Sequence, residues 1–416
     1  MHLRSVQPGT YMGDIDIGDM FLNFILHAKV QPHAGVDLTP FFPEELMGGT
    51  RTTLWEHWCR CAMGLTTSPY QAVQGILHSE EIIRGNPSDP SNIFRWDSLR
   101  LNLPGSESYN PNLPWVSKIR VSDGLLACDL IIYVDDVRTM GNTFEECRAA
   151  SRKAASVLNY LGLQDAVRKR CDPSTSPGAW SGSIVLTDAD TVDLILSQER
   201  WDKAKGMVTW INSQIHIGPT IDFKVLESYR GFLIYICRTY PAINPYLKGV
   251  HLTLDSWRPW RKDDGWKLTL AEIRAAYEEK GDNTYASLSR GSAPKLVTWV
   301  PRLVEDIGAL VTLFSTDSPP RRQIRPSRTA VACYKFGDAS GVGFGSSLVI
   351  DNVIHYRHGQ RDIRHSLESS NFRELANLIY AIEEAVKKGL LNDAELFVFT
   401  DNTAAESAFY KGTSSS

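Results

Sequence analysis

Residues 131–137 have the sequence Ile-Ile-Tyr-Val-Asp-Asp-Val, which places two adjacent acids between apolar residues that favour strands. The apolar run from Leu125 to Val134 predicts a strand that ends at this acidic pair. A buried carboxylate is costly unless it is neutralised, so a divalent cation is a natural partner for Asp135 and Asp136. The pair is a weak signal by itself, because short motifs of this kind also occur by chance.

A second acid stands at the end of another predicted strand, upstream of the first. Residues 9–18 alternate between apolar and polar side chains, and Asp16 lies at the end of the alternation. Phe21 follows Asp16 at an offset that Asp19 and Phe24 repeat. We choose Asp16 over Asp19 because Asp16 ends the strand.

A glycine turn and a helix start form the third motif. Gly64 is followed by Ser68-Pro69, a pair that favours the first turn of a helix, and we expect that helix to cover residues 68–85. Helices are also expected over residues 19–28, 143–161 and 198–211, and a short strand over 182–187.

These motifs together resemble a known family. Their order and spacing are similar to those of the palm motifs of reverse transcriptases: Asp16 to Phe21, Gly64 to Ser68-Pro69, and Tyr133-Val134-Asp135-Asp136. Residues 161–170 resemble the next palm motif, and residues 179–182 resemble the turn that follows it. The chain as a whole resembles the polymerase and RNase H part of a retrotransposon polyprotein.

The resemblance implies two-metal nucleotidyl transfer, with two Mg²⁺ or Mn²⁺ ions per active site. Asp16 and Asp135 would bridge both ions and Asp136 would support them. Phe21 would crowd the 2′ carbon of the incoming sugar, which implies a DNA product. The alternative for Phe21 is an ordinary core side chain.

The remaining nucleotide-binding residues are also implied by the resemblance. Gly64, Ser68 and Pro69 would shape the floor beneath the template and the incoming base, or they form a simple helix cap. Tyr133 would lie beside the catalytic pair. Lys169 is a candidate proton donor to pyrophosphate, or it belongs to a solvated basic cluster.

The middle of the chain carries the features expected of a nucleic-acid contact. Residues 198–211 resemble a thumb helix with one apolar face, and Arg200, Lys203 and Lys205 could reach phosphates. Residues 240–266 mix aromatic and basic side chains, a pattern that suits nucleic-acid contact and also ordinary packing of a connecting domain.

The last part of the chain predicts an α/β unit of its own. Three strands, a helix, a strand and a helix are expected between residues 330 and 410, with an apolar stripe on the first helix formed by Leu375, Ile379, Ile382 and Val386. Asp338, Glu374 and Asp401 match acids of RNase H, which cuts the RNA strand of a hybrid with two metal ions. The alternative is that these acids only cap strands and helices.

Composition limits the class of protein. The chain has 416 residues, of which 43% are hydrophobic and 22% are charged, and this excludes a mainly disordered chain. The longest apolar run, residues 232–237, is too short to span a bilayer. Seven scattered cysteines favour free thiols in a reducing compartment. We therefore expect an intracellular protein of the cytoplasm or nucleus, not secreted and without a membrane partner.

Charge is unevenly distributed along the chain. Residues 1–150 contain 11 Lys and Arg against 18 Asp and Glu, whereas residues 151–330 contain 25 against 19. Residues 331–416 contain 8 against 11. The middle part is therefore the region that favours a polyanion.

The sequence predicts an α+β polymerase palm and helical thumb, followed by an α/β RNase H-like domain. We expect a palm over residues 1–195 with its fingers largely missing, a thumb over 196–250, a connection and linker over 251–329, and an RNase H-like domain over 330–416 that is truncated before a fourth carboxylate. The predicted function is that of an RNA-directed DNA polymerase of a retroelement. The alternative is a catalytically inactive, truncated remnant that at most binds nucleic acid.

The predicted partners follow from that function. They are an RNA template, a DNA primer, RNA–DNA hybrid, deoxynucleoside triphosphates and other parts of a retroelement polyprotein. A third interpretation, an unrelated two-metal nuclease in which only the last domain matters, does not explain three ordered upstream motifs.

Overall fold

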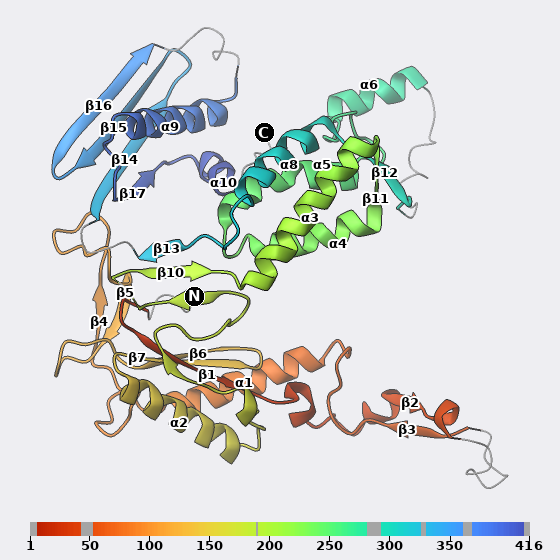
Figure 1. The fold of residues 1–416 in the computed structure, drawn as a ribbon, viewed down its shortest axis with the longest axis vertical. Helices are drawn as coiled ribbons and strands as arrows, with labels where there is room; N and C mark the ends of the chain where they lie inside the picture. The colour runs from red at the N-terminus through yellow and green to blue at the C-terminus, as the bar shows by residue number, and fades with distance from the viewer. Residues whose placement is uncertain are drawn as a thin grey trace. The chain divides into compact units, whose positions relative to one another are not determined.

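The computed structural model describes residues 6–42, 53–188, 190–280, 293–325, 330–360 and 368–411, with the side chains of 276–280 and 410–411 left out. The chain divides into two compact units, Met1–Val192 and Asp193–Ser416, here called the N-terminal and C-terminal units. Both mix helices and strands (Figure 1). No helix in the described ranges has the length and apolar character needed to cross a membrane.

A four-stranded antiparallel sheet organises the N-terminal unit. Its strand order is β6-β7-β1-β8. The strands are β1 (Tyr11–Asp16), β6 (Asp129–Tyr133), β7 (Asp136–Gly141) and β8 (Cys171–Ser174). The expected strands at Asp16 and before Asp135 are therefore confirmed, and they are neighbours of the same strand, β7.

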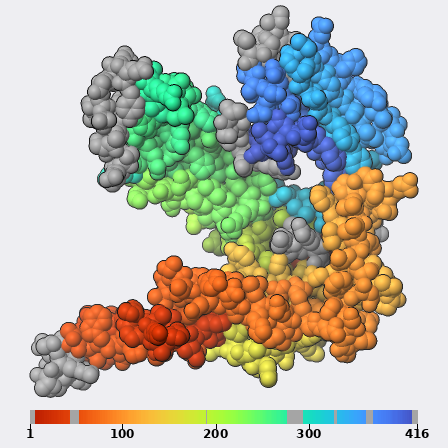
Figure 2. Space-filling model, turned by 180° about the vertical axis from the view of Figure 1, so that it is seen from behind, coloured from red at the N-terminus to blue at the C-terminus, as the bar shows by residue number. Residues whose placement is uncertain are grey.

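Two helices pack beside this sheet, α1 (Ser68–Arg84) and α2 (Phe144–Tyr160). Both were predicted from sequence. Ile15 and Val137 point from the sheet into a core that also contains Ile76 of α1 and Leu158 of α2. The orange surface in Figure 2 includes exposed parts of α1.

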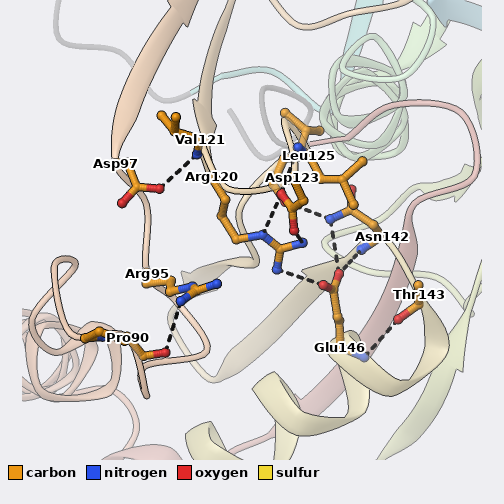
Figure 3. A network of polar contacts seen from close by, with 11 residues as sticks. Pro90, Arg95, Asp97, Arg120, Val121, Asp123, Leu125, Asn142, Thr143 and Glu146 are labelled. Atoms are coloured by element: carbon orange, nitrogen blue, oxygen red, sulfur yellow. Dashed lines mark hydrogen bonds and ion pairs between the residues drawn. The ribbon is translucent and has the colours of Figure 1, made fainter.

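The start of α2 is fixed by a polar network (Figure 3). The Thr143 side chain accepts a hydrogen bond from the backbone N–H of Glu146, which caps the helix. The guanidinium of buried Arg120 forms ion pairs with Asp123 at 2.9 Å and with Glu146 at 2.7 Å. Asn142 donates to the Glu146 carboxylate from its backbone and its side chain. This network ties the loop before β6 to the first turn of α2.

The helix expected over residues 19–28 is wrong. Only Met20–Asn23 form a short 3-10 helix, because Asp19 has a left-handed backbone with φ +48°. The Asn23 side chain donates to backbone carbonyls of Gly18 and Met20, which stabilises a turn in place of a helix.

The other elements of the N-terminal unit are short. Three-residue 3-10 helices cover Gln31–His33, Thr39–Phe41 and Val167–Lys169. The remaining strands are β2 (Gly35–Asp37), β3 (Trp55–His57), β4 (Ser98–Leu101), β5 (Val116–Ile119) and β9 (Ile184–Leu186). β10 (Val192–Ile195) lies where the two units meet along the sequence.

Helices dominate the first part of the C-terminal unit. They are α3 (Gln198–Ile217), α4 (Phe223–Ile236), a 3-10 helix (Pro241–Leu247), α5 (Lys248–Asp255), α6 (Leu270–Lys280) and α8 (Pro301–Leu313). Short strands β11 (Thr220–Asp222) and β12 (Leu296–Thr298) pair, and β13 covers Arg322–Arg325. The predicted apolar face of α3 is confirmed, since Trp201, Ala204, Val208 and Ile211 are all buried in one core.

A second four-stranded sheet forms the last part of the C-terminal unit, in the order β16-β15-β14-β17. The strands are β14 (Val331–Ala339), β15 (Gly343–Ile350), β16 (Val353–Gln360) and β17 (Ala394–Phe399). β17 runs parallel to β14, and the connection to it contains α9 (Ser370–Lys387); α10 (Thr403–Lys411) follows. The six predicted elements of this region are confirmed.

The predicted apolar stripe of α9 is wrong. The buried positions are Asn377, Leu378, Ala381 and Ala385, whereas Val386 is 58% exposed. Small alanines face the sheet because they let the helix approach it closely, a choice that hydrophobicity alone does not reveal. Ile379 and Ile382 instead line a cavity of about 470 Å³ together with residues of α10.

Candidate active site

Strand register brings the predicted acids of two distant motifs together. In the β1–β7 pair, Asp16 lies directly opposite Asp136. In the β6–β7 hairpin, Tyr133 also pairs with Asp136, and Val134 has φ +57° in the tight turn between them. Asp135 occupies the turn, and its backbone carbonyl accepts a hydrogen bond from the N–H of Ile17. Three carboxylates therefore belong to one end of the sheet.

Several negative charges are crowded together at this end of the sheet. Partial burial raises the pKa of the Asp136 carboxyl to about 6, and repulsion from Asp135, Asp16 and Asp14 adds to the effect of burial. Lys169 opposes the shift only weakly. A cation near Asp136 would relieve this cost, because it would favour the ionised carboxylate.

The carboxylate of Asp16 already has a cationic partner. Lys169 Nζ donates to both oxygens of Asp16 at 2.9 Å, and this hydrogen bond raises the pKa of the lysine. The ammonium is accessible, with its side chain 53% exposed. The lysine predicted as a proton donor thus lies at the site, and its contact there is with a predicted metal ligand.

A buried ion pair that sequence reasoning missed lies on the same strands. Arg138 is fully buried and donates to both oxygens of Asp14 at 2.7 Å. Arg138 Nη1 has no hydrogen-bond partner among the described residues. The sequence could have indicated part of this arrangement. Asp14 and Asp16 are two residues apart on β1, so their side chains project from the same face of the strand.

The predicted set of metal ligands is only partly assembled. Among the residues that the structure describes, no three His, Cys, Asp or Glu side chains lie close enough together to hold a metal ion. Oxygen donors of the right chemistry are present at Asp16, Asp135 and Asp136, because carboxylates are the ligands that Mg²⁺ prefers. The donor set therefore fits a magnesium ion in kind, and one of its members, Asp16, is paired with Lys169.

The other predicted residues of this unit lie as follows. Gly64 has φ +93° in an open turn, as its motif predicted, and Pro69 is exposed at the start of α1. Ser68 is buried, and its hydroxyl has no partner among the described residues, so it does not act as a helix cap. Tyr133 is half-exposed and contacts Trp180 edge to face.

Phe21 is partly buried and packs against the core beneath the sheet. Phe24, at the alternative position, packs on α1, where a Cβ placed on Gly75 would lie 2.3 Å from its ring. Both rings thus make packing contacts, and the role of Phe21 toward a sugar stays a prediction.

The three predicted phosphate-binding residues of α3 differ in their contacts. Arg200 lies over the Tyr235 ring at 5.4 Å, and Lys203 lies over the Phe232 ring at 4.7 Å. Lys205 donates to the backbone carbonyl of Thr316 and to the carboxylate of Asp317. Lys203 is exposed, so it is the best placed of the three to meet a phosphate.

Two of the three predicted acids of the C-terminal sheet share a cavity. Asp338 and Asp401 line a space of about 580 Å³ together with Phe336, Phe399 and His358. Glu374, on α9, does not line it. One Glu374 oxygen is buried without a hydrogen-bond partner among the described residues, and the other accepts from Ser370 at 3.4 Å.

No protein-family model matches the chain, and a search of curated proteins finds no match. Among solved structures, the chain is similar to foamy viral protease-reverse transcriptase in complex with RNA/DNA hybrid, with a TM-score of 0.45 and 11% identity over 100% of this chain and 42% of that one. It is also similar to that protein in complex with double-stranded DNA, with a TM-score of 0.43 and 12% identity over 95% of this chain and 61% of that one.

A third structure, the dRH form with double-stranded DNA, gives a TM-score of 0.43 and 12% identity over 98% of this chain and 53% of that one. The chain thus spans about half the length of the solved chains that it matches. This likeness is coarse, so the assignment that follows rests on the residues of the site.

Proposed function

We propose that the chain is an RNA-directed DNA polymerase of a retroelement, with an RNase H-like region after its helical part. The observation that carries the proposal is the pairing of Asp16 with Asp136 across β1 and β7, with Asp135 in the adjoining turn. Two motifs that are far apart in sequence thereby supply carboxylates to one end of a sheet. Transfer of a nucleotidyl group needs such a set, because charge develops on both the attacking and the leaving oxygen.

Asp16, Asp135 and Asp136 would hold the Mg²⁺ ions. When bound, these ions would neutralise the attacking 3′ oxygen and the leaving pyrophosphate. Lys169 would give a proton to the leaving pyrophosphate from its accessible ammonium, which lies at Asp16. Tyr133, half-exposed at the turn, would position the primer end beside the carboxylates.

The nucleic-acid partners in this proposal are an RNA template, a DNA primer and their hybrid, together with deoxynucleoside triphosphates. Lys203 on α3 supports a phosphate contact, because it is exposed on a helix that was expected to follow the duplex. Asp338 and Asp401 would hold a metal ion for RNA cleavage in the C-terminal sheet. The unpartnered oxygen of Glu374 suits a third ligand.

Primer extension on an RNA template with Mg²⁺ tests the polymerase. The wild-type chain and Asp135→Asn should be compared with Asp188→Asn, a matched loss of one charge at an exposed position of the same unit. We expect extension by the wild type and by Asp188→Asn, and a loss of at least about 100-fold in Asp135→Asn. Equal extension by Asp135→Asn and wild type would refute the assignment.

A second function is favoured by one observation. Lys169 engages both oxygens of Asp16, and the described residues do not gather three metal ligands. A catalytically inactive remnant that binds nucleic acid would keep this arrangement. Absence of extension by every variant, together with retained binding of RNA–DNA hybrid, would establish that second function.

A further inference from the structure

A cavity of about 500 Å³ lies in the segment that mixes aromatic and basic residues, outside every site described above. It is formed by the chain that follows α5, as far as the first turn of α6. Its lining combines apolar side chains with two indoles, three cations and one acid, namely Trp257, Trp260, Arg258, Arg261, Lys267 and Asp255.

The backbone around this cavity is held in a defined shape. Arg261 and Lys267 form a β-bridge across a turn at Gly265, and the Leu268 N–H donates to the Trp260 carbonyl. Trp260 has φ +65°, a left-handed conformation that is strained for a residue of this kind. The fold thus keeps a large aromatic side chain at the cavity despite backbone strain.

Positive charge predominates at the cavity. Asp255 is the acid in its lining, and its carboxylate pairs with Arg258 at 3.2 Å and with Arg261 at 2.9 Å. The Arg261 side chain is nearly buried and is also tied to the Gly265 carbonyl, so it is a fixed charge. Lys267 is exposed. Three cations against one acid favour a ligand with negative charge.

Aromatic side chains line the cavity beside these cations. The Arg258 guanidinium lies over the Trp257 ring, 5.5 Å from the ring centroid. The Trp257 indole nitrogen is buried and has no hydrogen-bond partner among the described residues.

We propose that this cavity binds one nucleotide unit of nucleic acid in single-stranded form. The base would stack on the Trp260 indole and its phosphate would meet Arg258 and Lys267, since aromatic platforms flanked by cations are how proteins bind single strands. The same chemistry would accept a free nucleoside monophosphate. Binding here needs no polymerase reaction, so this inference and the proposed function can fail independently.

The test is the binding of a fluorescent oligothymidylate of about 12 nucleotides to the full chain, followed by anisotropy. Trp260→Leu keeps an apolar side chain and removes the ring, and we expect it to weaken binding about tenfold. Trp260→Phe keeps a ring at the same strained position and should bind within about threefold of wild type. Asp188→Asn, at an exposed position outside the cavity, should bind as the wild type does.

Lys267→Ala provides a variant whose folding is not in question, because the side chain is exposed. We expect it to weaken binding about threefold and to flatten the dependence of affinity on salt. Lys224→Ala is its matched control, because Lys224 is also an exposed lysine of the C-terminal unit and does not line the cavity. Lys224→Ala should bind as the wild type does.

Competition distinguishes the two sources of the ligand. Displacement of the oligonucleotide by thymidine monophosphate at equal nucleotide concentration supports the cavity as a mononucleotide site, and failure to displace supports a strand. Two results would overturn the proposal: no binding of the oligonucleotide by the wild type, or equal affinities for wild type, Trp260→Leu and Lys267→Ala.

Discussion

Asp16 and Asp136 face each other across the antiparallel strands β1 and β7, whereas Asp338 and Asp401 reach one cavity from the ends of parallel strands β14 and β17. In the N-terminal unit, the register itself pairs two carboxylates and crowds them together. In the C-terminal unit, the β14–β17 ladder ends at Phe336 and Phe399, so both acids lie just beyond this parallel pairing, while Asp338 still pairs with Gly345 of β15.

Antiparallel and parallel strands bring like charges together in different ways. Antiparallel pairing puts the acids within the sheet, where burial and mutual repulsion raise the pKa of Asp136 to about 6. Buried Arg138 and accessible Lys169 compensate part of that charge through Asp14 and Asp16. Parallel strands end at the same edge of a sheet, so acids near their ends can share a cavity, which Arg357 and His358 also line.

The largest expected effect concerns the buried ion pair beneath the first site. Arg138→Leu would leave the Asp14 carboxylate without its partner in a nearly buried position. We expect the free energy of unfolding of the N-terminal unit to fall by about 4 kcal/mol, because an uncompensated buried charge remains. Hydrogen exchange of the β1 and β7 amides measures this loss.

The contrasting variant is Arg357→Leu in the C-terminal unit, where the ion pair with Glu384 is partly exposed. It should produce a smaller loss, because solvent already screens that pair. The double variant Asp14→Leu/Arg138→Leu should recover part of the stability. Equal losses of stability for Arg138→Leu and Arg357→Leu would contradict the contrast between a buried and a partly exposed ion pair.

Helix-to-sheet packing gives the next effect. A Cβ on Gly141 of β7 would lie 2.6 Å from the backbone nitrogen of Cys147, whereas one on Gly337 of β14 would lie 2.9 Å from the Leu378 side chain. A backbone cannot move aside as the end of a leucine can. We expect Gly141→Ala to cost about 3 kcal/mol and Gly337→Ala about 1 kcal/mol, measured by denaturant unfolding of each unit.

The most direct test of this prediction is which of the two substitutions, Gly141→Ala or Gly337→Ala, costs more stability. If Gly337→Ala destabilises its unit more than Gly141→Ala does, the packing of α2 on the first sheet is less tight than the structure indicates.

The smallest effect is a dependence of stability on pH. The folded-state pKa of Asp136 is about 6, above the ordinary value of 3.8. Between these two pH values the folded state therefore holds a proton that the unfolded state has lost. Stability of the N-terminal unit therefore decreases as pH rises between about 4 and 6. Asp136→Asn removes this decrease and should stabilise the unit at pH 7 by about 1 kcal/mol after solvent screening.

Thermal unfolding at pH 4.5 and pH 7 measures this difference. The control is Asp188→Asn, which lacks the crowded surroundings and should leave the pH dependence of the wild type unchanged. A stability that rises over this range in the wild type and not in Asp136→Asn would show that the carboxylate is stabilised by folding.

The sequence determined the elements that local patterns specify. Alternation and β-formers predicted β1 and β6, the Ser68-Pro69 start predicted α1, and the six elements after residue 330 followed from their periods. It failed at residues 19–28, where a left-handed Asp19 and side-chain hydrogen bonds from Asn23 outweigh helical periodicity. It also failed for the buried face of α9, because close approach to a sheet selects small residues.

Only the tertiary structure decided which side chains meet. The pairing of Asp16 with Asp136, the contact of Lys169 with Asp16, and the buried Arg138–Asp14 pair all depend on the register of strands that are distant in sequence. Local patterns fix which residues point to one face, since side chains alternate along a strand with a period of two. Register is set by the packing of the whole sheet on α1 and α2, so it became visible only in the folded chain.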